Sequence, residues 1–124
     1  MNTIKLIHQA TETNITFCYG AKAYSKYMKK QHGLIEHIEK GAITTILTDN
    51  TGKYCIVVGI KKLENISVLK ALIVHELSHV VTELMIEYNF KCDEFRSYTL
   101  QWLYLEIMTS LDLIILKDDK RDLG

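Results

Sequence analysis

The chain has 124 residues, which suits one domain with a single hydrophobic core. Its 15 basic and 15 acidic residues cancel, so no basic excess points to nucleic acid and we expect no nucleic-acid partner. The three cysteines form no CxxC pair, which argues against a disulfide framework. The N-terminus lacks the apolar stretch of a signal peptide, and charges interrupt every apolar run before the roughly 20 residues of a membrane span. We therefore expect a cytoplasmic protein without a membrane partner.

The first third of the sequence predicts two strands and a helix. Residues 3–8 and 14–19 are rich in β-branched and aromatic side chains, which favours short strands. Residues 20–31 place Ala, Tyr and Met on one side and lysines on the other, which predicts an amphipathic helix ending at Gly33. The lysines are interpreted as the solvated face of that helix.

A β-hairpin is predicted next. The runs 42–48 and 53–60 are both β-rich, and the sequence DNTG between them is typical of a turn. Ser67 can then cap a long helix over about 68–88 by accepting a backbone N–H. Apolar residues surround almost the whole of this helix, so we expect it to be the central helix, covered on most sides.

A second long helix is predicted over about 94–116, with a frayed, charged tail at 117–124. Mixed strands and a helix followed by two long helices indicate an α+β fold, with one domain over 1–116.

The sequence His75-Glu76-Leu77-Ser78-His79 is an HExxH motif. Residues four apart share one face of a helix, so His75 and His79 can close on one metal ion at roughly 2.0–2.1 Å each. Glu76 lies about 100° around the helix, where it can accept a proton from a metal-held water. Burying these three polar residues without a partner would cost several kcal/mol. The motif therefore predicts a Zn²⁺ site, in preference to hydrogen-bonded core histidines.

A catalytic zinc ion needs a third protein ligand and an open position. No histidine follows His79, so a downstream ligand would be one of the carboxylates Glu83, Glu87, Asp93, Glu94 and Glu106. Glu83 shares a face with His79 but lies about 9 Å along the axis from the middle of the histidine pair, which suits a neighbour at the rim. Glu94 opens the second helix, where the helix dipole also favours an acidic residue. In a tight antiparallel pair it would lie roughly 10–14 Å from His79, so ligation requires an early end of the first helix or a steep crossing.

The stretch HELSHVVTELMIEYNFKCDEFRSYTLQWL, within about 68–105, resembles small proteins of tailed-bacteriophage genomes that are named metallopeptidases by motif. Their pattern is HExxH, about fifteen residues, and then E-x-x-A/S-Y, which residues 94–98 match. It is also similar to the E-x-x-S part of gluzincins such as thermolysin, with Tyr98 at the position of their following aspartate. The resemblance implies a zincin-like fold, in which a small mixed sheet packs on the helix that carries HELSH. It also implies Zn²⁺ held by His75, His79 and Glu94, and the host cytoplasm as location. It implies no substrate.

The expected activity is peptide-bond hydrolysis of a peptide or protein by zinc-activated water, with Glu76 as general base. Tyr98 is the first choice for a donor to the oxyanion, with Tyr19 and Tyr88 as alternatives. Substrate could lie as an added strand along 53–60. The alternative is a non-catalytic, zinc-stabilised structural or interaction module, for example in a phage assembly.

Overall fold

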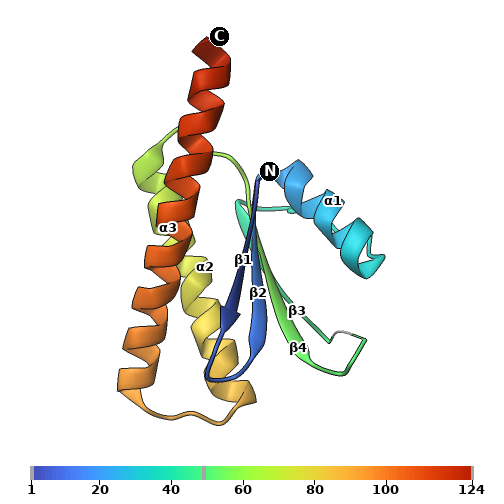
Figure 1. Ribbon diagram of the computed structural model, residues 1–124, viewed down its shortest axis with the longest axis vertical. Helices are drawn as coiled ribbons and strands as arrows, with labels where there is room; N and C mark the ends of the chain where they lie inside the picture. Colours follow the sequence, from blue (N-terminus) through green and yellow to red (C-terminus); the bar gives the residue numbers. More distant parts are fainter. Residues whose placement is uncertain (1, 49, 124) are drawn as a thin grey trace.

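The computed structural model describes residues 2–48 and 50–123, with side chains described as far as Lys117. Within these ranges the chain forms four strands and three helices (Figure 1). In chain order they are β1 (Thr3–His8), β2 (Thr13–Tyr19), α1 (Ala21–His32), β3 (Ala42–Thr48), β4 (Tyr54–Ile60), α2 (Ile66–Glu87) and α3 (Asp93–Leu123). The predicted α+β fold is confirmed.

The strands form one mixed sheet in the order β1-β2-β4-β3. β1 pairs with β2, and β3 with β4, in antiparallel fashion, whereas β2 and β4 run parallel at its centre. The predicted hairpin is confirmed, because Ala42 of β3 pairs with Ile60 of β4 and Thr48 pairs with Tyr54. β1 and β3 are therefore the two edge strands of the sheet.

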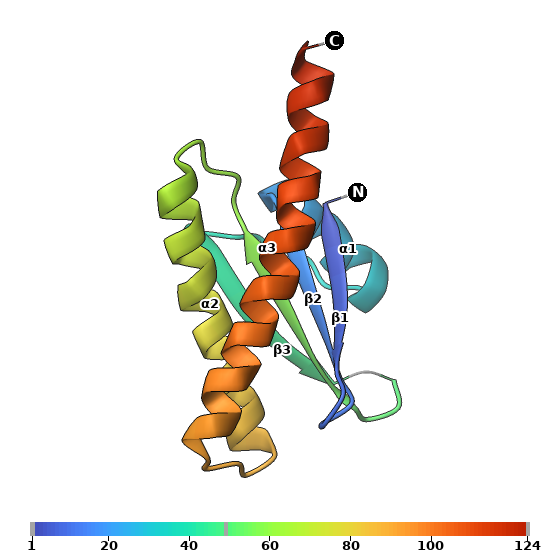
Figure 2. The same ribbon diagram turned by 60° about the vertical axis from the view of Figure 1, so that its left-hand side comes forward.

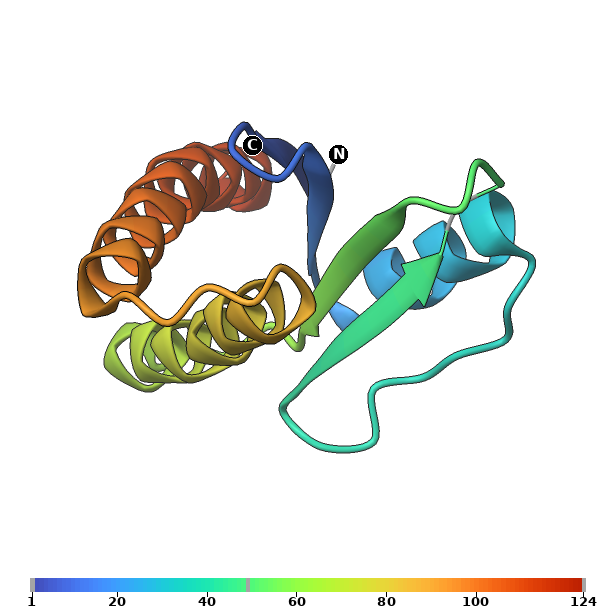
Figure 3. The same ribbon diagram turned by 90° about the horizontal axis from the view of Figure 1, so that it is seen from below.

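Helices cover both faces of the sheet. α1 lies on one face, and α2 and α3 lie together on the other (Figures 1 and 3). The central strand β4 shows why both faces are covered: Ile56, Val58 and Ile60 belong to the core under α2 and α3, while Val57 belongs to the core under α1. A strand that is buried on both faces typically has a continuous run of apolar residues, as the β4 sequence YCIVVGI does.

The helix boundaries follow local capping chemistry. Gly33 ends α1 in the left-handed conformation, at φ 66°, and its amide donates to the carbonyl of Lys29 at 3.1 Å. The predicted stop at Gly33 is confirmed. The cap of α2 was expected at Ser67, and this is wrong: the side chain of Asn65 accepts from the backbone N–H of Val68 at 3.1 Å, so α2 begins at Ile66. Asn and Ser are equally good N-caps, and an asparagine two residues upstream competes directly.

α2 is less enclosed than its composition predicts. Val68 and Ile86 are 53% and 67% exposed, so the expectation of a helix covered on most sides is wrong. α2 has the sheet and α3 as neighbours, and no described element lies over its remaining side (Figure 3). A helix in an outer layer of the fold can be covered only on the sides that meet a neighbour. The open side carries the two histidines of the motif.

α3 runs antiparallel to α2 over the same face of the sheet and continues well past it (Figures 1 and 2). Its backbone is helical as far as Leu123, so the helix end predicted near residue 116 is too early. Asp93–Lys117, a 25-residue part of α3, is long and apolar enough to span a membrane by length and composition alone. The core helices of soluble proteins pass the same test, so cytoplasmic localisation stays a prediction.

Candidate metal centre

The two histidines of the motif lie side by side on the open face of α2. Helical geometry brings positions 75 and 79 together, and the Nε2 atoms of His75 and His79 are 3.1 Å apart. Their rings are nearly perpendicular, with centroids 4.7 Å apart. Both side chains are solvent-exposed, so an ion could reach them without any movement of the fold.

The spacing of the two nitrogens fits a zinc ion. Two ligand atoms held at about 2.0–2.1 Å from a tetrahedral ion lie about 3.3 Å apart. The observed 3.1 Å between the Nε2 atoms of His75 and His79 is close to this value. An N–H···N hydrogen bond between two neutral imidazoles has a similar length, so metal content is the measurement that separates the two interpretations.

Glu76 completes the group. The ligand atoms of His75, Glu76 and His79 all lie within 4.8 Å of one another. Unlike the histidines, Glu76 is only 7% exposed, because it points toward the sheet. The hydroxyl of Thr44 in β3 donates to its Oε2 at 2.6 Å, and no described residue hydrogen-bonds to its Oε1. The strand thus orients the carboxylate and leaves one oxygen free beside the histidines.

Thr44 is the residue that the sequence reasoning missed. Ala42, Thr44 and Ile46 alternate along β3 and line one groove with α2. The sequence did contain one indication of a buried polar contact, because Thr44 lies between two apolar residues on the inward face of the strand. A partner 32 positions away in the sequence could not be assigned from that signal alone.

A groove of about 320 Å³ runs between β3 and α2 beside the motif. It is lined by Ala42, Ile43, Thr44, Ile46, Glu76, His79 and Glu83. β3 pairs only with β4, so its outer edge is open among the described residues. The expected substrate strand along 53–60 is wrong, because β4 is paired on both sides and has no edge to offer.

Glu94 does not lie with the motif. It is solvent-exposed in the first turn of α3, next to Asp93, where the helix dipole favours acidic side chains. In the part of the chain that the structure describes, three possible ligand residues gather only at His75, Glu76 and His79. Ligation by Glu94 would require an early end of α2 or a steep crossing by α3. Instead, α2 continues to Glu87, and α3 runs back antiparallel to it.

The three candidate tyrosines also lie outside the groove. Tyr98 is 67% exposed and lines a different pocket on α3. Tyr19 is buried in the core under α2 and α3, and the hydroxyl of Tyr88 is hydrogen-bonded to Thr13 at 3.1 Å. Among the predicted carboxylates, Glu83 is the one that lines the groove with His79.

Comparison of the chain with protein-family models, with curated proteins and with solved structures found no match. The function is therefore inferred from the geometry of the site and from the motif.

Proposed function

We propose that this protein is a zinc-dependent peptidase in which His75 and His79 hold the metal and Glu76 is the general base. The observation that carries the proposal is the cluster of two imidazole nitrogens 3.1 Å apart with a carboxylate within 4.8 Å. A purely structural zinc site needs four closing ligands and no free carboxylate oxygen beside them. The zincin-like and phage-type relationship belongs to the same proposal and is supported by the motif alone.

The residues of the chain have distinct tasks in this proposal. Bound zinc would lower the pKa of a water toward about 7 and polarise the scissile carbonyl. Glu76 Oε1 takes the proton of the attacking water and delivers it to the leaving amine, while Oε2 stays bonded to Thr44. Of the candidate third ligands we favour Glu83, because it lines the groove that contains His79. Its side chain would have to turn toward the histidines, since its carboxylate is not among the ligand atoms gathered at the motif.

The substrate would be an extended peptide added to the open edge of β3. Main-chain hydrogen bonds to an edge strand align a peptide regardless of its sequence. β3 forms one wall of the groove and α2 the other, so a peptide on this edge would pass the motif. Alternate side chains of the peptide would then enter the groove.

The first test is metal content together with cleavage. We expect about one zinc ion per chain after purification without added metal, and cleavage of a quenched peptide library that stops with a chelator and returns with zinc. A fluorescent peptide of scrambled D-residues serves as the uncleavable control. A chain that takes up no zinc when zinc is offered would contradict the proposal.

A non-catalytic zinc-stabilised module is the second candidate, and one observation favours it. His75 and His79 face solvent, so an ion held there could take its remaining ligands from a partner, for example in a phage assembly. This candidate predicts stoichiometric zinc, no cleavage of any library peptide, and a lower melting temperature after chelation.

Thr44 is expected to be a positioning residue for Glu76. Thr44→Val keeps the shape of the side chain but removes the hydroxyl that donates to Oε2, so we expect kcat to fall about tenfold to a hundredfold. Thr44→Ser, which keeps a hydroxyl, is expected to restore most of the rate. Zinc content should be the same in both variants, since Thr44 is not a ligand. Equal rates in Thr44→Val and wild type would show that the hydrogen bond has no role in catalysis.

A further inference from the structure

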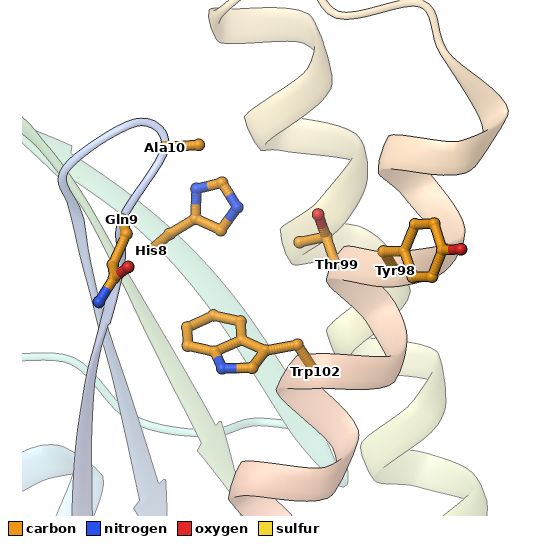
Figure 4. Close-up of a pocket in the computed structure, with 6 residues that line it drawn as sticks. All are labelled: His8, Gln9, Ala10, Tyr98, Thr99 and Trp102. Atoms are coloured by element: carbon orange, nitrogen blue, oxygen red, sulfur yellow. The ribbon is translucent and has the colours of Figure 1, made fainter.

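A second pocket, of about 330 Å³, lies between the β1–β2 turn and the first turns of α3. β1 and β3 are opposite edges of the sheet, so this pocket is separate from the groove of the motif. It is lined by His8, Gln9, Ala10, Tyr98, Thr99 and Trp102 (Figure 4). Ligand pockets in proteins span about 300–1,000 Å³, so its size suits one small ring system.

His8 is held in place at the edge of this pocket. It is 7% exposed, and its Nδ1 is 2.7 Å from the hydroxyl of Thr11. A chain of hydroxyls continues from Thr11 to Thr13 at 2.8 Å and from Thr13 to Tyr88 at 3.1 Å. Each hydroxyl can donate in either direction, so the chain can reverse without movement of heavy atoms. The Nε2 of His8 can therefore present either a proton or a lone pair.

Two buried polar side chains offer unused hydrogen-bonding atoms to the pocket. No residue in the described ranges hydrogen-bonds to His8 Nε2 or to the hydroxyl of Thr99, and neither atom is sealed from solvent. Thr99 is 6% exposed. Figure 4 shows His8 with one ring nitrogen turned toward Thr99, across the open space between the hairpin and α3. Water can occupy these two hydrogen-bonding positions, and a ligand with matching polar atoms could displace it and bond to both.

Aromatic rings form the walls around these polar atoms. His8 is edge-on to Trp102, with centroids 5.9 Å apart, and to Phe95, at 5.6 Å. Tyr98 stands at the rim with its hydroxyl pointing away from the pocket (Figure 4). Trp102 is partly buried, and its indole lies below His8 as a flat surface on which a ring could stack.

The pocket provides no formal charge. Its lining includes no Asp, Glu, Lys or Arg side chain, and burial lowers the pKa of His8, which favours the neutral imidazole. A charged ligand group buried here would lose its hydration without gaining a counter-charge. An uncharged ligand is therefore favoured.

From these contacts we propose that this pocket binds an uncharged planar heteroaromatic ring with hydrogen-bonding atoms along one edge, such as a nucleobase or a nicotinamide ring. The ring stacks on Trp102, and its polar edge pairs with His8 Nε2 and the Thr99 hydroxyl. The proposal does not depend on the metal centre or on peptidase activity.

Trp102 makes the test direct, because it is the only tryptophan in the chain. Its fluorescence is measured while nicotinamide or adenosine is added to the full-length protein, with cyclohexanecarboxamide as a control that has the same amide but no flat ring. We expect a saturable change with a dissociation constant in the range of about 1 mM or below for at least one aromatic probe. The probe that gives a saturable change shows whether the pocket takes a nicotinamide ring or a nucleobase.

Two variants locate the bound probe. Thr99→Val removes one hydroxyl at nearly constant volume and is expected to weaken binding about threefold to tenfold. Ala10→Leu, at an exposed turn position, fills the pocket and should abolish binding even if Thr99→Val does not fold. Linear quenching without saturation by both probes, equal binding of cyclohexanecarboxamide, or saturable binding that Ala10→Leu leaves unchanged would each overturn the proposal.

Discussion

Glu76→Gln is expected to keep zinc bound and to lower the rate of peptide cleavage by about 10²–10⁴-fold. Glutamine has the same shape as glutamate and can still accept a hydrogen bond from Thr44, so the fold and the two imidazoles should be unaffected. It cannot take a proton from the attacking water, and general-base catalysis supplies about this factor. The measurement is kcat/KM on the best peptide found with the wild-type chain, together with zinc content.

The matched control for this variant is Glu39→Gln. Glu39 is exposed on the segment between α1 and β3 and lines none of the pockets described above, so the same chemical change there should leave the rate as it is. A Glu76→Gln chain that cleaves as fast as wild type would remove the general-base role. If wild type and Glu76→Gln are equally inert while both bind zinc, the structural or interaction module becomes the better account.

The second large effect concerns the metal ligands. His75→Ala and His79→Ala are each expected to reduce zinc from about one ion per chain to close to none, since each removes one of only two imidazoles at the site. Both side chains are exposed, so the fold should survive. Zinc content by mass spectrometry after dialysis, with circular dichroism as the check on folding, is the measurement.

Two further variants decide the third ligand. We expect Glu83→Gln to weaken zinc binding and Glu94→Gln to leave it unchanged, because Glu83 lines the groove and Glu94 is exposed on α3. The reverse result would support the assignment that the phage-type resemblance implies. It would also mean that the start of α3 moves toward His79 when zinc binds. Zinc binding unchanged in both variants would leave the third position to water or to a partner.

For Glu94, the sequence pattern and the structure disagree: the pattern implies a zinc ligand, whereas the structure places the residue away from the motif. The spacing of fifteen residues from His79 to Glu94 matches a sequence pattern, and a pattern carries no distance. The distance depends on where α2 ends and how α3 crosses it, which are matters of tertiary packing. In the structure α2 extends to Glu87 and α3 returns beside it. Glu94, in the first turn of α3, therefore lies near the loop that connects the two helices and not beside the histidines.

The sequence also could not predict that the motif lies next to an edge strand. The hairpin of β3 and β4 was predicted from two β-rich runs and a turn, but nothing in those runs says which strand also pairs with β2. The sheet order decides that β4 is central and β3 is open. That order results from long-range pairing between residues such as Asn14 and Cys55, which local propensity cannot encode.

Residue spacing and composition were sufficient to predict the local chemistry of the motif. Helical periodicity was enough to predict that His75 and His79 share a face, because a spacing of four residues has one geometric outcome on a helix. Strand and helix types followed in the same way from alternation, amphipathicity and Gly33. Three contacts depend on the tertiary structure: Thr44 holds Glu76, Glu83 and not Glu94 borders the groove, and Tyr98 lies at the rim of a second pocket that contains His8. Each of these contacts joins segments far apart in the chain, where the packing of whole elements sets the distance.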